Sequence, residues 1–192
     1  MIHVRQLEDE RDEVLAELVR TGSAAAFALL VARHRNADWV IARNMCATLR
    51  DAELVLRQTF LSAWRDGGAL APGARFATWL YRMALRNALA QREGDRPKPS
   101  CSLESLLPAF DAAGRLLASE GRWSEVEARK IGGLLREALE CMDDQTRAAF
   151  VLRDLLDLPL EEAAAVLETS PAAAGRDAHR ARLMLRGFIE RV

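Results

Sequence analysis

Residues 75–92 read RFATWLYRMALRNALAQR and contain no Asp or Glu, although acidic residues are common elsewhere in the chain. Wound at about a hundred degrees per residue, the stretch forms a two-faced helix. One face carries the apolar side chains Phe76, Leu80, Met83 and Ala84. The other carries Arg75, Arg82 and Arg86, and Trp79 lies at the border between the faces. The pattern predicts a packed helix whose outer face is basic and edged by an aromatic ring.

That outer face suits unpaired nucleic acid, because phosphates need cations and splayed bases need flat apolar surfaces. Periodicity alone supports a second interpretation equally well. In that interpretation Trp79 belongs to the core and the arginines only solvate a surface.

Composition predicts a soluble globular protein of one or two domains, since the 192 residues are 50% hydrophobic and 29% charged. Ala, Leu and Arg dominate while β-branched residues are sparse, which favours helices over strands. We therefore predict an all-α protein. The net charge of −1 hides an uneven distribution, with an acidic segment at 125–169 followed by an arginine-rich one at 170–192. This asymmetry suggests two different partners or surfaces.

The sequence carries few signs of metal, membrane or enzyme chemistry. Cys46, Cys101 and Cys141 are far apart, with no C-x-x-C pair, so neither a zinc site nor a disulfide framework is indicated. We therefore expect all three cysteines to be thiols. We expect the protein to be cytoplasmic, because no signal peptide or membrane-spanning run is present. No phosphate loop, carboxylate pair or nucleophile–base set is visible. We therefore expect no enzyme activity, catalytic residue, cofactor, metal or small-molecule substrate.

Helical periodicity divides the chain into two helical regions joined by a linker. The first, residues 1–93, is expected to contain helices at 11–19, 24–45, 51–64 and 75–92. The linker, residues 94–124, is broken by prolines and glycines. It is nevertheless apolar enough that parts of it should dock on a domain or a partner.

The second region, residues 125–192, ends in a predicted helix-turn-helix. Helices are expected near 125–141, 144–156 and 160–168, followed by a last helix to about 190. Ser170 is a good N-cap and Pro171 suits the first helical position, which sets the start of that last helix. A short helix, a tight turn and a longer basic helix match the plan in which the second helix enters the major groove. The predicted apolar face comprises Ala174, Ala178, Ala181 and Leu185.

Both regions together resemble the extracytoplasmic-function sigma factors of bacterial RNA polymerase. The motif FALLVARH at 27–34 is similar to the first helix of that family's core-binding domain. DAE at 51–53 with TFLSAWR at 59–65 resembles its polymerase-contacting helix, and FATWLYRMA at 76–84 its promoter-melting helix. The linker fragment SLESLLPAFD at 102–111 resembles one branch of the family. RAAFVLRD at 147–154 and HRARLMLR at 179–186 resemble its helix-turn-helix domain.

The resemblance implies transcription initiation without catalysis by this chain. Sigma domain two, residues 1–93, would bind the polymerase core and capture unpaired bases of the downstream promoter element. Sigma domain four, residues 125–192, would bind the upstream element as duplex, and the linker would lie in the RNA channel. The expected partners are RNA polymerase core, promoter DNA and an anti-sigma factor, which in this family is often membrane-anchored.

Site residues are carried over by matching the motifs. The expected DNA-binding residues are Arg75, Trp79, Arg82 and Arg86 in the first domain and Arg176, Asp177, His179 and Arg180 in the second. The expected polymerase-binding residues are Glu53, Leu54, Arg57 and Gln58. The loop 66–74 is either a pocket for a flipped base or a plain connector.

The chain departs from the family pattern at several of these positions. Acids are usual at the positions of Leu54 and Gln58, where they would meet basic residues of the polymerase clamp, so affinity for the core either falls or shifts to apolar contacts. Arg86 replaces the usual Asn. Asp177 either repels DNA or accepts a hydrogen bond from a cytosine amino group. These departures leave an alternative function open: an interaction protein that titrates anti-sigma factor or polymerase and binds promoters poorly.

Overall fold

The computed structural model describes residues 7–67, 70, 74–93 and 135–189. The chain splits into two compact units, Met1–Asp95 and Arg96–Val192, which we describe separately. Every regular element in the described parts is a helix, so the all-α prediction is confirmed for them. The expected linker and most of the candidate base pocket at 66–74 lie outside the described residues, and both stay predictions.

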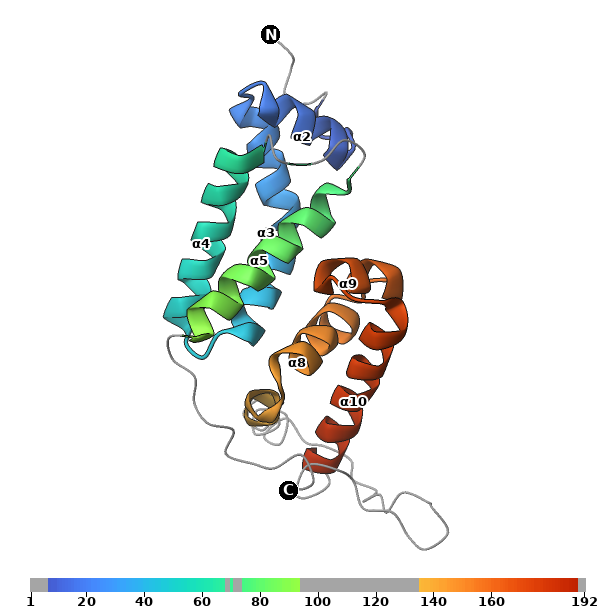
Figure 1. The fold of residues 1–192 in the computed structure, drawn as a ribbon. Helices are drawn as coiled ribbons and strands as arrows, with labels where there is room; N and C mark the ends of the chain where they lie inside the picture. Colours follow the sequence, from blue (N-terminus) through green and yellow to red (C-terminus); the bar gives the residue numbers. More distant parts are fainter. Residues whose placement is uncertain (1–6, 68–69, 71–73, 94–134, 190–192) are drawn as a thin grey trace, which may run out of the picture. The chain divides into compact units, whose positions relative to one another are not determined.

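In its described residues, the first unit is a bundle of four helices, and the last three of them contact one another pairwise (Figure 1). In chain order they are α2 (Asp12–Arg20), α3 (Ala24–Met45), α4 (Leu49–Asp66) and α5 (Phe76–Glu93). α2 packs on α3 and α5. Side-chain caps define two of the starts, because Ser23 Oγ accepts from Ala26 N at 3.3 Å and Thr48 Oγ1 accepts from Asp51 N at 3.1 Å.

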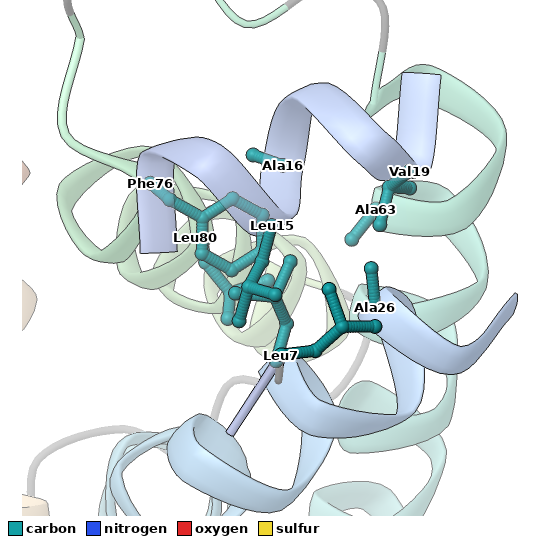
Figure 2. Packing of buried hydrophobic residues seen from close by; sticks show 9 residues of the cluster. Leu7, Leu15, Ala16, Val19, Ala26, Ala63, Phe76 and Leu80 are labelled. Atoms are coloured by element: carbon teal, nitrogen blue, oxygen red, sulfur yellow. The ribbon is translucent and has the colours of Figure 1, made fainter. Parts of the chain in front are cut away.

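The core of this unit forms where all four helices meet. Leu15 and Ala16 of α2 lie against Phe76 and Leu80 at the start of α5 (Figure 2). Small residues from α3 and α4, Ala26 and Ala63 among them, complete the cluster. The predicted buried face of α5 is confirmed, since its members are buried or packed against this core. Burial of this face fixes which side of α5 is left facing outward.

The buried side of α3 contains an acidic residue, Asp38, that the helical pattern did not single out. Leu30, His34, Asp38 and Ile41 follow one another at helical spacing on that side, and all are buried. Asp38 is 0% exposed, and neither of its carboxyl oxygens has a hydrogen-bond partner among the residues that the structure describes. Burial raises the pKa of Asp38 from 3.8 to about 8.

The second unit ends in the helix-turn-helix (Figure 1). Residues 135–141 are helical, followed by α8 (Asp144–Phe150), a short π-helix η2 (Val151–Leu155), α9 (Leu160–Leu167) and α10 (Pro171–Ile189). The predicted start of α10 is confirmed, because Ser170 Oγ accepts from Ala173 N at 3.2 Å and Pro171 is the first helical residue. Glu168, with a φ of 55°, makes the tight turn between α9 and α10.

The core of the second unit lies between the helix at 135–141, α8 and α10. The predicted apolar face of α10 is confirmed, since Ala174, Ala178, Ala181 and Leu185 are all buried. The cysteine prediction is wrong in part. Cys46 is buried and takes part in no disulfide, but Cys141 is disulfide-bonded. Sequence spacing could not reveal this bond, because pairing depends on which residues approach in space.

We expect Gly175→Ala to stabilise α10 by about 0.5–1 kcal/mol, because Gly carries an entropic penalty inside a helix. The structure has room for the methyl group: a Cβ at this position would lie 3.7 Å and 3.9 Å from the Leu160 side chain, which is ordinary contact. The measurement is amide hydrogen exchange of α10 in the full chain. Ala173→Gly is the matched opposite change and should speed exchange. Equal exchange in Gly175→Ala and the parent would contradict the expectation.

Candidate nucleic-acid and partner surfaces

The outward side of α5 carries the four predicted DNA-binding residues of the first unit. Arg75, Trp79, Arg82 and Arg86 are spaced at four, seven and eleven residues from the first, which places them on one side of the helix. Arg75 stands directly before α5, and its carbonyl oxygen accepts from Trp79 N at 3.2 Å. Arg75 and Arg86 are exposed, and Arg82 is half-buried. The stretch is therefore a basic strip along the helix, as its lack of acids suggested.

Trp79 lies at the border between the core and this basic strip. Its ring is half-buried, with its centroid 5.7 Å from that of Phe76 and the ring planes tilted by 48°. The side chain packs against the core cluster as well. The residue thus contributes to packing and still exposes part of its surface beside the arginines, so its role toward nucleic acid stays a prediction.

A partly buried polar network contacts the opposite side of α5. Tyr81 OH lies 3.0 Å from His34 Nδ1, and His34 Nε2 lies 2.5 Å from Asp12 Oδ2. Arg33 donates to the other oxygen of Asp12 at 2.7 Å. Burial acts to raise the pKa of Asp12, but the hydrogen bonds from Arg33 and His34 outweigh it and hold the pKa below 3.8. This network ties α5 to α2 and α3 and fixes how the helix is rotated.

The outward side of α10 carries the predicted DNA-binding residues of the second unit. Arg176, His179 and Arg180 are exposed. Asp177 is half-buried and lies a hundred or so degrees from Arg176 around the helix, at the border with the buried face. The carboxylate is therefore at the flank of the basic surface and not at its centre.

Two ion pairs engage the arginines of α10, and sequence reasoning missed both. Arg180 Nη1 lies 3.9 Å from Asp143 Oδ2, and Arg182 Nε lies 2.7 Å from Asp154 Oδ1 of η2. The Arg182 pair is the tighter and links α10 to the π-helix. The Arg180 pair is loose and half-exposed, and exposed pairs contribute only about 0–1 kcal/mol. Arg180 could therefore exchange Asp143 for a phosphate at little cost.

We expect Asp143→Asn to strengthen binding of the full chain to a random-sequence DNA duplex by about 1.5- to 5-fold, the equivalent of one exposed ion pair. Asn retains the N-cap that Asp143 provides to Thr146 N at 2.8 Å, so α8 should persist. Fluorescence anisotropy would measure the affinity. Glu140→Gln is the control, because it makes the same change in net charge at an exposed position. Equal effects of the two substitutions would show that Asp143 does not compete for Arg180.

The exposed side of α4 carries the predicted polymerase-binding residues. Glu53, Leu54, Arg57 and Gln58 are all exposed, whereas Val55 is buried and Leu56 is half-buried. The run of three consecutive apolar residues at 54–56 is thus divided between the core and the surface. Leu61 and Trp64 are exposed further along the same helix.

The described residues show neither a metal-ion cluster nor a membrane-spanning helix. They contain no cluster of three or more His, Cys, Asp or Glu that could hold a metal ion. None of the helices described is both long and apolar enough to cross a membrane.

The comparisons with known proteins point to a single family. Residues 132–185 match the model of the family described as Sigma-70, region 4. The chain is 27% identical over 164 residues to the ECF RNA polymerase sigma-E factor of Escherichia coli K12, covering 84% of this chain and 85% of that protein. It is 28% identical over 183 residues to the RNA polymerase sigma factor CnrH of Cupriavidus metallidurans, covering 95% and 96%.

Solved structures of two sigma factors are also similar to this chain. CnrH in complex with the cytosolic domain of CnrY superposes with a TM-score of 0.69 at 25% identity, covering 95% of this chain and 99% of CnrH. The sigma factor RpoE in complex with the anti-sigma factor NepR from Bartonella quintana superposes with a TM-score of 0.62 at 16% identity, covering 85% and 96%. The second match supports the fold alone.

Proposed function

Because this chain belongs to the extracytoplasmic-function sigma factors of bacterial RNA polymerase, we propose that it directs the polymerase core to specific promoters and helps to melt them. The observation that carries the proposal is the acid-free strip of α5, where three arginines flank a half-exposed Trp79. Cations beside an aromatic ring suit unpaired bases and their phosphates. The proposed role is binding, with no catalytic step by this chain.

In this proposal Trp79 and Arg82 act on the melted strand. Trp79 offers its exposed surface to an unstacked base, and Arg82 contacts a phosphate. The partly buried network of Tyr81, His34 and Asp12 supports this role, because it fixes the rotation of α5 and keeps the strip outward. Arg75 and Arg86 extend the strip toward both ends of the helix.

The upstream promoter element is proposed to bind α10 as duplex. Arg176, His179 and Arg180 are exposed on the second helix of the helix-turn-helix, where such proteins contact base edges and phosphates. Asp177 lies at the flank and is close enough to the groove to repel phosphates or to accept from a cytosine amino group.

The exposed side of α4 is proposed to bind the polymerase core, and an anti-sigma factor is proposed to keep the chain silent. The similar sigma factor RpoE was solved with its anti-sigma factor NepR, and CnrH was solved with the cytosolic domain of CnrY. The exposed apolar residues on α4 suit binding to either the polymerase core or an anti-sigma factor, because burial of apolar side chains drives association.

A second candidate function is favoured by one observation, the loss of acids on α4. Leu54 and Gln58 stand where the family resemblance leads us to expect acids, so in this alternative the chain titrates an anti-sigma factor and binds polymerase weakly.

Affinity capture of the full chain from the native cytoplasm and membranes tests the proposal. Recovery of the large polymerase subunits would support the sigma-factor function. Recovery of a small membrane protein without polymerase would favour the titrating function.

A further inference from the structure

Cys141 of the second unit takes part in a disulfide bond. The chain has three cysteines, and Cys46 of the first unit is buried and takes part in no disulfide. The remaining cysteine, Cys101, lies outside the described residues. Elimination within one chain therefore leaves Cys101 as the cysteine to which Cys141 is bonded.

The bond attaches to a point that supports the recognition helix. Cys141 is the last residue of the helix at 135–141, and its half-buried side chain packs against the core cluster of the second unit. That cluster contains Met142, the next residue along the chain, together with Met184 and Leu185 of α10. How firmly residues 135–142 are held therefore affects the packing of the buried face of α10.

The same point borders the N-cap of α8. Asp143 follows Cys141 by two residues, and its carboxylate accepts hydrogen bonds from the backbone N and the Oγ1 of Thr146, both at 2.8 Å. Asp143 also forms the loose ion pair with Arg180 of α10, at 3.9 Å. A change at Cys141 is thus close to the start of α8 and to one arginine of the outward side of α10.

The cellular compartment argues against a permanent bond. The inference rests on the proposed function here, because that function puts the chain with RNA polymerase in the cytoplasm, where thiol systems keep most cysteines reduced. Disulfides in that compartment are usually transient and serve catalysis or redox sensing. The proposed role of this chain is binding without catalysis, which leaves redox sensing for the bond at Cys141.

We propose that the Cys141 disulfide is a reversible redox switch that sets the stability of the helix-turn-helix unit. Hydrogen peroxide oxidises one of the two cysteines from a thiol to a sulfenic acid and releases one water. The second thiol attacks this sulfur and releases a second water, so two thiols and one peroxide give one disulfide. A dithiol reverses the change by exchange, because its two thiols supply the two electrons and two protons that restore the cysteines.

The oxidised chain has the more stable second unit in this proposal. A crosslink lowers the entropy of the unfolded chain, and it does so more for a long loop such as the one between residues 101 and 141. Since α10 packs on residues 135–142 and carries the proposed duplex-binding residues Arg176 and Arg180, the oxidised chain should also bind duplex DNA more tightly.

Amide hydrogen exchange of the full chain tests the switch itself. After treatment with hydrogen peroxide, exchange in the helix at 135–141 and in α10 should be at least about tenfold slower than in dithiothreitol. Disulfides that close loops of this length typically contribute more than the 1.4 kcal/mol to which a tenfold change corresponds. Added dithiothreitol should restore the faster exchange. Peptide mass spectrometry without reduction should show Cys141 joined to Cys101.

Two variants remove the bond from opposite ends. Cys141→Ser and Cys101→Ser should each abolish the response of the exchange rates to peroxide, and Cys46→Ala is the matched control that should keep it. Fluorescence anisotropy with a random-sequence duplex tests the link to DNA. The oxidised parent chain should bind at least about fivefold more tightly than the reduced one, and neither serine variant should show a difference.

Several results would overturn the proposal. These are a bond that resists excess dithiothreitol in the folded chain, a bond from Cys141 to a cysteine other than Cys101, or equal exchange rates in the two redox forms. The duplex measurement separates the proposal from the proposed function. Redox-dependent exchange without duplex binding in either form would contradict only the proposed function of α10. Equal duplex binding by both forms would leave that function standing and overturn the link between the switch and DNA.

Discussion

Replacing Asp38 by Asn is expected to raise the free energy of unfolding of the first unit at about pH 7 by roughly 4 kcal/mol. The parent carboxyl is fully buried, and no residue in the described parts hydrogen-bonds its oxygens. Burial without a partner disfavours the charged form and raises the pKa of Asp38 to about 8. Asn has nearly the same shape, and it stays neutral at every pH.

The pH dependence should reveal this cause. The folded state keeps a proton on Asp38 that the unfolded state releases above its pKa of 3.8. The free energy of unfolding of the first unit is therefore highest below that pKa. It falls as the pH rises toward about 8, by about 1.4 kcal/mol per pH unit. In Asp38→Asn this loss disappears, so the two proteins should be nearly equal at about pH 4 and diverge above it.

Urea unfolding at several pH values, followed by tryptophan fluorescence, would measure the effect. Of the four tryptophans in the chain, Trp39, Trp64 and Trp79 lie in the first unit, so the signal reports mainly on that unit. Asp66→Asn, at an exposed carboxylate, is the control and should leave the pH dependence unchanged. Parallel pH curves for the parent and Asp38→Asn would show that Asp38 is not the titrating group.

Trp79→Ala is expected to reduce promoter opening by about 5- to 150-fold, since stacking of a base on an aromatic ring contributes about 1–3 kcal/mol. Arg82→Ala should reduce it by about tenfold or more through loss of a charged contact to phosphate, which is worth about 1.5–3 kcal/mol. Permanganate reactivity of promoter thymines in complexes with polymerase core would measure the opening.

Controls must separate stacking from packing, because Trp79 also contacts Phe76. Trp79→Leu keeps an apolar side chain at the core border and removes the ring, so it should retain most of the stability and lose most of the opening. Arg20→Ala removes an exposed arginine from α2 and should have no effect on opening. Normal thymine reactivity with Trp79→Leu and Arg82→Ala would contradict the role of the basic strip.

Local signals in the sequence predicted much of this structure. The start of α10 could be predicted because Ser170 and Pro171 act within a single turn. The buried faces of α5 and α10 could be predicted because their periodicity is determined by helix geometry. The roles of the exposed residues on α4, α5 and α10 stay predictions, since exposure does not identify a partner.

Long-range contacts could not be predicted in the same way. The pair of Arg182 with Asp154 joins residues far apart in sequence, and so does the pair of Arg180 with Asp143. Each depends on how α10 packs against α8 and η2. Asp38 did carry a usable signal, because it lies four residues after His34 and three before Ile41 on the buried stripe of α3. The sequence alone does not predict that Asp38 is buried, because charged residues are rarely buried without a partner.

Transcription in vitro with purified polymerase core tests the central claim most directly. The full chain, the core and a library of fragments from the native genome would be incubated together, and the transcript starts would be sequenced. The sigma-factor account predicts transcripts that start at a defined set of sites sharing an upstream and a downstream element and that vanish without the chain. Transcripts that are absent, or that start at the same sites without the chain, would contradict it.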